Sequence, residues 1–260
     1  MNESLPRSLE RPRALRLPWA FEILLYPRQI FQKVASLGVS SWFTPLLVLS
    51  ISALMLVMVA GPIKQQAAQT GQFELPPEYQ YLSPEDQARI QEALAATQGP
   101  VFIYVFPALS SIAGVWMGWL VVGGLLHLTL TLLGGRGATS GSMNLVAWSA
   151  TPFALRDLVR IIYMLSSDRL ILNPGLSGFI EVTQSSFRLF LNKLFFHVDI
   201  YLVWHILLLM IGVQIASGLS RRKSILGAIL PVLMVLILQT LMSFLITRLA
   251  GLTIIRPFFF

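Results

Sequence analysis

The stretch VFIYVFPALSSIAGVWMGWLVVGGLLHLTLTLL, residues 101–133, decides the class of this protein. It contains no Asp, Glu, Lys or Arg, and a helix needs about 20 predominantly apolar residues to cross a hydrocarbon core of about 30 Å. Four further apolar stretches are long enough to do the same, at residues 42–62, 143–165, 197–217 and 224–250. The sequence therefore predicts an all-α polytopic membrane protein in which residues 42–250 form a five-helix transmembrane bundle.

The composition supports a lipid environment. The chain has 260 residues, of which 55% are hydrophobic and 12% charged, and its mean hydropathy is +0.70. Soluble domains carry about 25% charged residues, so lipid must cover much of this surface. Cysteine is absent, which excludes disulfides, thiolate metal sites and a cysteine nucleophile. The sequence also lacks His-Glu-x-x-His, Gly-x-Ser-x-Gly and Gly-Lys-Ser/Thr motifs, so we expect no enzymatic activity, no metal and no cofactor.

Two segments precede the first span. Residues 1–14 are basic and contain two prolines, and we expect a disordered tail. In residues 15–41 apolar side chains recur at helical spacing on one face, and Pro27 should divide the segment into two short helices. Such an amphipathic segment is typical of a helix that lies in the membrane interface. The alternative is a helix packed against the cytoplasmic side of the bundle.

The connecting loops and the basic residues predict the orientation. Residues 63–100 should contain a short helix capped by Ser83. Residues 166–196 contain an Asn-Pro-Gly turn, then an apolar face that is either a second interfacial helix or the start of the fourth span. With the N-terminus inside, the inner segments carry ten Lys and Arg residues and the much longer outer segments carry six. The positive-inside rule therefore predicts a cytoplasmic N-terminus, with both long loops and the C-terminus outside.

The second apolar stretch has two features of its own. At about 1.5 Å per residue, residues 101–133 would extend about 50 Å, so we expect them to tilt, or to protrude and kink near Pro107. Ser110, Gly114 and Gly118 recur every four residues, and small residues let helix backbones approach closely. We expect this small-residue face to pack inside the bundle, although the pattern does not distinguish an internal neighbour from a partner's helix.

Several polar side chains fall inside the apolar stretches, where an unpaired charge costs about 3 kcal/mol. They are Arg156, Asp157 and Arg160 in the third span, Asp199 and His205 in the fourth, and His127 in the second. Counted from the outer ends of the spans, Arg160 and Asp199 lie at similar depth, as do Arg156 and His205. One hypothesis is a polar pathway or proton relay. The other, which we favour, is pairing between helices that fixes how the spans pack.

Pro152 removes one backbone donor from the third span and predicts a bend there, either a hinge or a static kink. We favour the static kink. The hydroxyl groups of Ser149 and Thr151 are placed to satisfy the backbone groups that the proline frees.

Four short motifs resemble the Yip family, the five-span membrane proteins named as Ypt/Rab-interacting proteins. They are YPRQIF at residues 26–31, WFTP at 42–45, LLGGRG at 132–137 and VAWSATP at 146–152. The last two resemble the family's Gly-Gly turn, followed by a helix with a small/aromatic-Ser-x-x-Pro core. The resemblance covers about residues 20–250. Two features depart from the family pattern, Trp148 in place of a frequent tyrosine and the Arg156-Asp157 pair.

The resemblance implies a cytoplasmic N-terminus and a non-enzymatic role. Eukaryotic relatives bind prenylated small GTPases in vesicle traffic. The short N-terminal arm of this chain instead resembles bacterial members of the family. Those members look like accessory subunits of larger assemblies, in some cases beside ABC-type exporters. The first hypothesis is therefore an accessory or scaffold subunit of the bacterial inner membrane that contacts lipids and other membrane subunits and no nucleic acid. The alternative is a small transporter or channel with a polar pathway between the second, third and fourth spans.

Overall fold

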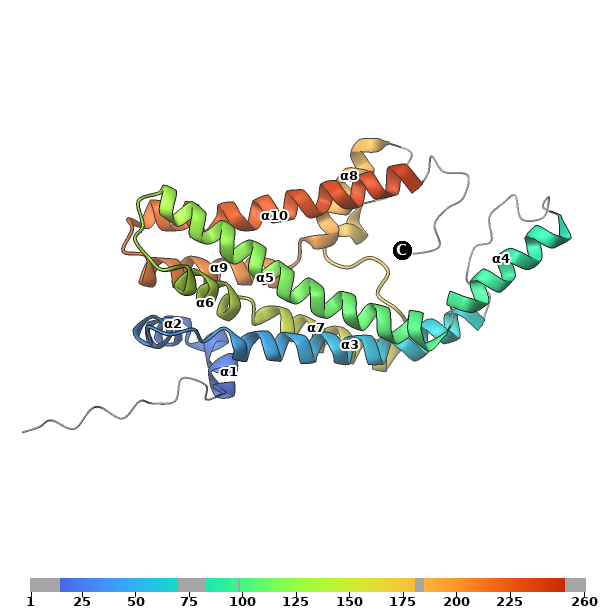
Figure 1. The fold of residues 1–260 in the computed structure, drawn as a ribbon, viewed down its shortest axis with the longest axis horizontal. Coiled ribbons are helices and arrows are strands. Elements are labelled where there is room, and N and C mark those ends of the chain that lie inside the picture. The colour runs from blue at the N-terminus through green and yellow to red at the C-terminus, as the bar shows by residue number, and fades with distance from the viewer. Residues whose placement is uncertain (1–14, 70–82, 98, 181–184, 251–260) are drawn as a thin grey trace, which may run out of the picture.

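The computed structural model describes residues 15–69, 83–97, 99–180 and 185–250, and every regular element within these ranges is a helix. The expected disordered tail, residues 1–14, lies outside the described residues. Long helices run side by side and form an elongated bundle (Figure 1). The longest are α3 (Phe43–Gln69), α5 (Phe106–Leu132) and α10 (Arg221–Ala250).

Helix length and apolar composition qualify three segments of the described chain as membrane spans, rather than the predicted five. They are Phe43–Gln66, Val101–Leu132 and Arg221–Leu249. The number rises to four if α8 (Ser186–His197) and α9 (Ile200–Ala216) form one span, although these two helices are bent by 61°. The apolar face predicted within residues 183–196 thus lies on α8, a helix of its own before α9.

The predicted third span, residues 143–165, is divided at the expected bend into α6 (Thr139–Ser149) and α7 (Pro152–Ser167). Pro152 has no backbone N–H to donate to the carbonyl four residues earlier, which belongs to Trp148. The Thr151 hydroxyl donates to that carbonyl at 3.1 Å instead. The division thus falls at the predicted proline, and a neighbouring hydroxyl satisfies the group that the proline leaves free.

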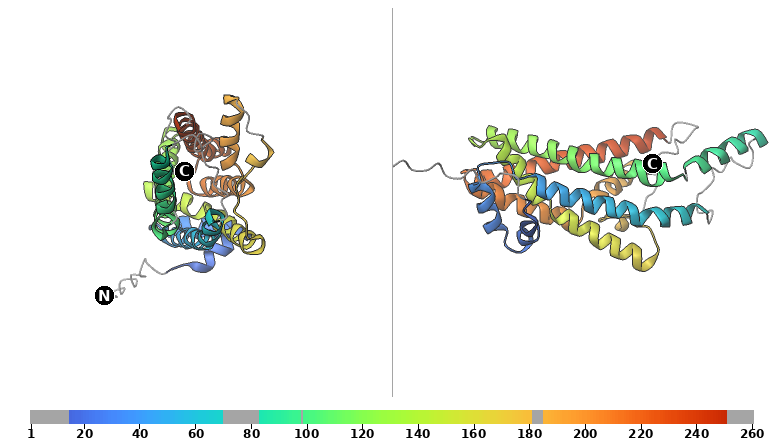
Figure 2. Two further views of the ribbon diagram at one scale, coloured as in Figure 1. Left: turned by 90° about the vertical axis from the view of Figure 1, so that its right-hand side faces the viewer. Right: turned by 60° about the horizontal axis from the view of Figure 1, so that its bottom comes forward.

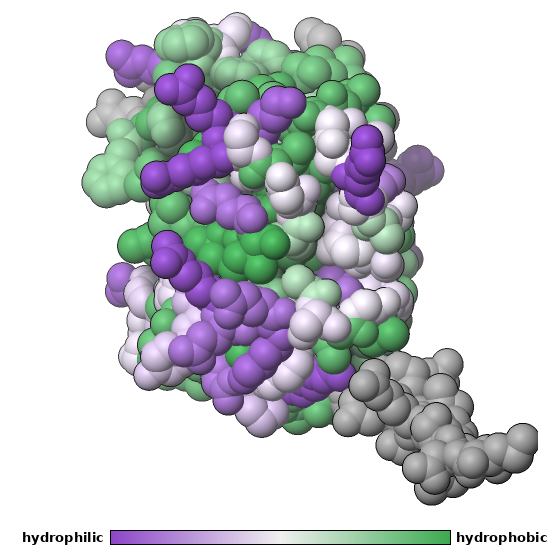
Figure 3. Space-filling view, turned by 90° about the vertical axis from the view of Figure 1, so that its left-hand side faces the viewer, coloured by the Kyte–Doolittle hydropathy of each residue, from purple (hydrophilic) through white to green (hydrophobic). Residues whose placement is uncertain are grey.

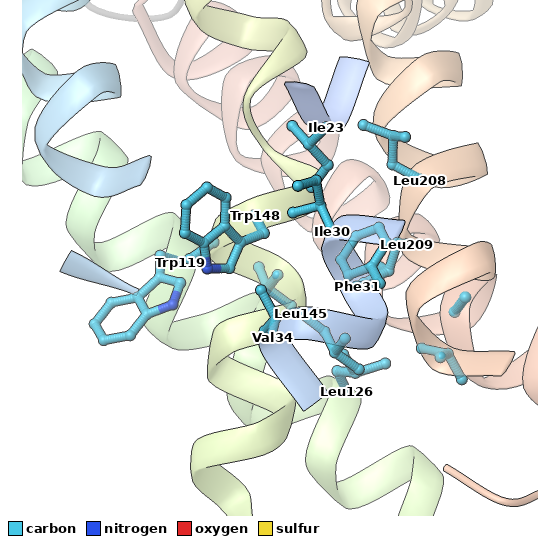
Figure 4. Close-up of a cluster of buried hydrophobic side chains, with 14 of the residues drawn as sticks. Ile23, Ile30, Phe31, Val34, Trp119, Leu126, Leu145, Trp148, Leu208 and Leu209 are labelled. Atoms are coloured by element: carbon cyan, nitrogen blue, oxygen red, sulfur yellow. The ribbon is translucent and has the colours of Figure 1, made fainter. Parts of the chain in front are cut away.

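The N-terminal segment forms two short helices, α1 (Leu17–Leu25) and α2 (Pro27–Ser36), which meet at Pro27 as the sequence predicts. Their apolar faces pack against the bundle, since Ile23, Ile30 and Phe31 are each at most 1% exposed. Figure 4 shows these side chains lying between Trp148 and Leu209. Of the two alternatives for this segment, the structure therefore shows packing against the end of the bundle.

A set of polar contacts holds the connection between α2 and α3 against α6. The Asn144 amide donates to the Val39 carbonyl at 3.0 Å, and its oxygen accepts from the Ser41 backbone N–H at 2.8 Å. The Trp148 indole N–H donates to the Ser41 hydroxyl at 3.0 Å. Each such bond contributes about 1 kcal/mol. Trp148, which lies within the VAWSATP motif, is therefore a structural residue at the centre of the core.

The ends of the bundle differ in character. α4 (Pro84–Thr97) extends away from the bundle at the end opposite α1 and α2 (Figure 2), and the Ser83 hydroxyl caps it as predicted. A π-helical turn, η2 (Val101–Val105), leads directly into α5. Figure 3 looks onto the other end, where hydrophilic side chains form patches among apolar ones. There the Lys223 ammonium donates to the Leu133 carbonyl and links α10 to α5.

The predicted Asn-Pro-Gly turn lies against the connection between α8 and α9. Gly175 has φ +66°, and the following residue, Leu176, donates its backbone N–H to the carbonyls of Phe195 and Val198, both at 3.0 Å. A short 3-10 helix, η3 (Ser177–Phe179), follows. The turn thereby fixes the start of α9.

We predict that Gly175→Ala destabilises the protein by more than about 1 kcal/mol, because an L side chain is strained at this φ. Its Cβ would also lie 2.6 Å from the carbonyl oxygens of Phe195 and Val198. Gly178→Ala is the matched control, since its Cβ meets nothing closer than 3.7 Å. Thermal unfolding in mild detergent measures both variants. Equal melting temperatures would show that the turn does not fix the start of α9.

Candidate functional site

Four charged side chains that the sequence places inside the spans meet where α7 faces the start of α9. We call Arg156, Asp157, Arg160 and Asp199 the charge cluster. Asp199 Oδ2 lies 3.5 Å from Arg156 Nη1 and 3.9 Å from Arg160 Nη2, and Asp157 Oδ1 lies 3.8 Å from Arg156 Nε. The contact between Arg160 and Asp199 agrees with their predicted equal depth. Two cations and two anions balance in charge.

The helices fix the geometry of the charge cluster. Arg156 and Arg160 are four residues apart on α7, so their side chains lie on the same face. Asp199 caps the N-terminus of α9, where its Oδ1 accepts from the Leu202 backbone N–H at 2.8 Å. Asp157 points toward α3 and contacts Ser52 Oγ at 2.9 Å. Each carboxylate therefore has a hydrogen-bonding contact besides its arginine.

Phe153 connects the charge cluster to His205. The guanidinium carbon of Arg156 lies 4.7 Å from the centre of the Phe153 ring, and that ring lies 5.2 Å from the imidazole of His205. Arg156 and His205 are thus separated by an aromatic ring and do not form the direct pair that their equal depth suggested. His205 is 4% exposed. The position of the Arg156 guanidinium over the Phe153 ring is favourable by about 1 kcal/mol.

Two polar atoms near the charge cluster have no hydrogen-bond partner in the described part of the chain. They are Arg156 Nε and His205 Nδ1, and both are buried. The ion-pair distances of 3.5 to 3.9 Å also exceed the length of a charge-assisted hydrogen bond, which is about 2.8 Å. The charge cluster is consequently paired in charge but has unused capacity to donate hydrogen bonds.

A cavity of about 480 Å³ lies between α3 and α5 to α10, and Arg156, Asp157 and Arg160 of the charge cluster line it. Its ionisable lining consists of Arg156, Asp157, Arg160, His197 and His205, and the rest of its lining is mostly apolar. Ligand sites in proteins are typically about 300 to 1,000 Å³, predominantly apolar, with a few placed polar groups. The arrangement can therefore hold a molecule with an apolar body and a polar head.

Two other sequence-predicted features lie apart from the charge cluster. His127 borders a separate cavity of about 130 Å³ with Gly137 and Ala216. Gly114 and Gly118 line the rim of the larger cavity, and a Cβ at either position would meet nothing within 4 Å. The prediction that this small-residue face packs inside the bundle is therefore wrong.

Other glycines make the close helix contacts instead. A Cβ at Gly212 would lie 2.9 Å from the Phe31 ring, and one at Gly227 would lie 2.7 Å from Leu130. Sequence reasoning missed these positions because they stand alone, without a repeat. It also missed Ser52, whose signal was a hydroxyl in the middle of an otherwise apolar stretch.

A comparison with protein families finds one matching model. It is described as the Yip1 domain and matches residues 21–242. This confirms the resemblance carried by the four sequence motifs. No curated protein and no solved structure matches the chain.

We predict that Asp199→Asn lowers the free energy of unfolding by about 3 kcal/mol, because both arginines lose their shared partner. Asn still caps a helix, so Asp199→Ala should cost about 1 kcal/mol more. Denaturation in mild detergent measures the series, with Asp168→Asn in an exposed turn as control. If Asp199→Asn is as stable as the parent protein, the charge cluster does not hold α7 to α9.

Proposed function

Because the chain belongs to the Yip1 domain family, we propose that it is a non-enzymatic accessory subunit of a larger membrane assembly. In this proposal the protein lies in the cytoplasmic membrane of a bacterium, in contact with lipids and with other membrane subunits, such as those of an ABC-type exporter. Its own bundle provides a rigid support, and a free helix face receives a helix of the partner.

The observation that carries the proposal is the open small-residue face of α5, which comprises Ser110, Gly114 and Gly118. A glycine inside a helix costs about 1 kcal/mol relative to alanine, so a retained glycine usually has a packing reason. Gly123, Gly212 and Gly227 have such a reason, since a Cβ at each would collide with a neighbouring side chain of this chain. Gly114 and Gly118 have space around them. A helix from another subunit fits this face, because small residues allow close approach of two backbones.

The distribution of basic residues supports the proposed orientation. Arg136 lies in the turn after α5, and Arg221, Arg222 and Lys223 begin α10. The Lys223 contact with Leu133 brings these two segments together at one end of the bundle. The positive-inside rule favours this end as the cytoplasmic one.

We predict that Gly114→Leu abolishes co-purification of partner subunits from native membranes in mild detergent, because the added side chain blocks backbone approach. The melting temperature of the purified variant should not fall, since space surrounds this position. Ala113→Leu is the matched control, because Ala113 is also exposed on α5 but about 100° around the helix. If the parent protein purifies without any stable partner, the proposal fails.

The cavity favours a second candidate function, a small transporter or channel whose polar pathway lies between α5, α7 and α9. Its specific observation is that Arg156, Asp157, Arg160 and His205 share one cavity wall. Ionisable groups inside membrane segments commonly mark transport pathways.

For the transporter we predict that Asp157→Asn abolishes solute or proton flux in vesicles reconstituted with the purified protein. Asp168→Asn, which changes an exposed carboxylate, should leave the flux intact. An absence of flux with the parent protein removes this candidate.

A further inference from the structure

We propose that the 480 Å³ cavity is a binding site for one membrane phospholipid. The phosphate would bind at Arg156 and Arg160, and an acyl chain would lie along the apolar walls of α3, α5 and α10. Lipid binding here does not require a partner subunit, although Gly114 and Gly118 of the small-residue face also line this cavity.

The two arginines form a suitable phosphate site. Their guanidinium groups lie one helical turn apart and both approach the same oxygen, Asp199 Oδ2. Their side chains remain 27% and 25% exposed, so part of each guanidinium is open to a ligand. Arg presents planar pairs of N–H donors that match phosphate oxygens. Arg156 Nε, which lies 3.8 Å from Asp157 Oδ1, has no hydrogen-bond partner within the described residues.

The carboxylates of the charge cluster do not exclude a phosphate. Asp157 contacts the Ser52 hydroxyl, and Asp199 is held by the Leu202 backbone N–H. Asp199 is not among the residues that line the cavity, and Asp157 keeps its contact with Ser52. The arginines can therefore donate to phosphate while the acids keep the local charge low.

His205 supplies a second buried polar atom without a hydrogen-bond partner. It lines the same cavity, is 4% exposed, and its Nδ1 atom has no hydrogen-bond partner in the described chain. A buried polar atom without a partner is unfavourable. An ester or phosphate oxygen of a lipid in the cavity would satisfy it when Nδ1 carries the proton.

The walls and the entrance favour a lipid over a free anion. The apolar lining comes mainly from α3, α5 and α10 and includes Leu49, Ala53, Val115, Val122, Val232 and Leu236. α5 and α10 lie close together near α6 and diverge toward α8 (Figure 1). Gly114 on α5 and Gln239 on α10 line the cavity and are exposed, and their neighbours Met117 and Leu238 are exposed apolar residues. A ligand can therefore enter from the hydrocarbon side.

The test titrates the full chain, delipidated in mild detergent, with dioctanoyl phosphatidylglycerol. The melting temperature and the fluorescence of the tryptophans are followed, because Trp119 lines the cavity. We expect saturable binding that raises the melting temperature. Dioctanoylglycerol, which lacks phosphate, and inorganic phosphate, which lacks chains, should each bind at least about tenfold more weakly, a difference of about 1.4 kcal/mol.

Two variants probe the two halves of the site. Arg160→Gln removes one phosphate contact, and Ala53→Phe fills the apolar part, so each should weaken phospholipid binding about tenfold or more. Arg169→Gln, which changes an exposed arginine outside the cavity, should bind as the parent protein does. Equal binding of dioctanoylglycerol would show a purely apolar cavity, and equal binding of inorganic phosphate would show a free-anion site. Either result, or unchanged binding in both cavity variants, overturns the proposal.

Discussion

The division of one apolar stretch at Pro152 is the constraint on which the rest of the structure depends. The proline ends the hydrogen-bond ladder, and the Thr151 hydroxyl satisfies the carbonyl of Trp148. The chain therefore forms two helices, α6 and α7, that contact different neighbours. α6 turns Asn144 and Trp148 toward the connection between α2 and α3, and α7 turns its arginines toward α9. With one continuous helix, both sets of contacts would have to form along a single straight axis.

The sequence predicts the elements that depend on local chemistry. Apolar length predicts the long helices, Pro27 and Pro152 predict the divisions, and Ser83 predicts the start of α4. The equal depth of Arg160 and Asp199 in their predicted spans also predicts the contact between them. The match to the Yip1 domain family agrees with the sequence motifs. Trp148, Ser149 and Thr151, which lie in one of these motifs, are all buried structural residues.

The sequence does not predict which apolar faces contact protein and which contact lipid, because both environments select similar residues. Phe31 looks suited to the membrane interface, yet it packs against Gly212 in the core. Gly114 looks suited to a buried crossing, yet it is exposed. The cavity could not be predicted either, because it results from the relative positions of several helices. Buried ion pairs such as those of the charge cluster add little net stability compared with an apolar replacement, so their value here lies in fixing one arrangement of α7 against α9.

The shortness of α9 has a consequence for the surrounding bilayer. Its 17 residues extend about 25 Å, whereas the 30 residues of α10 extend about 45 Å. A hydrocarbon core of about 30 Å would exceed the first and fall short of the second. The protein thus presents an uneven hydrophobic thickness around its circumference. Lipids beside α9 would have to thin, while those beside α10 thicken or the helix tilts.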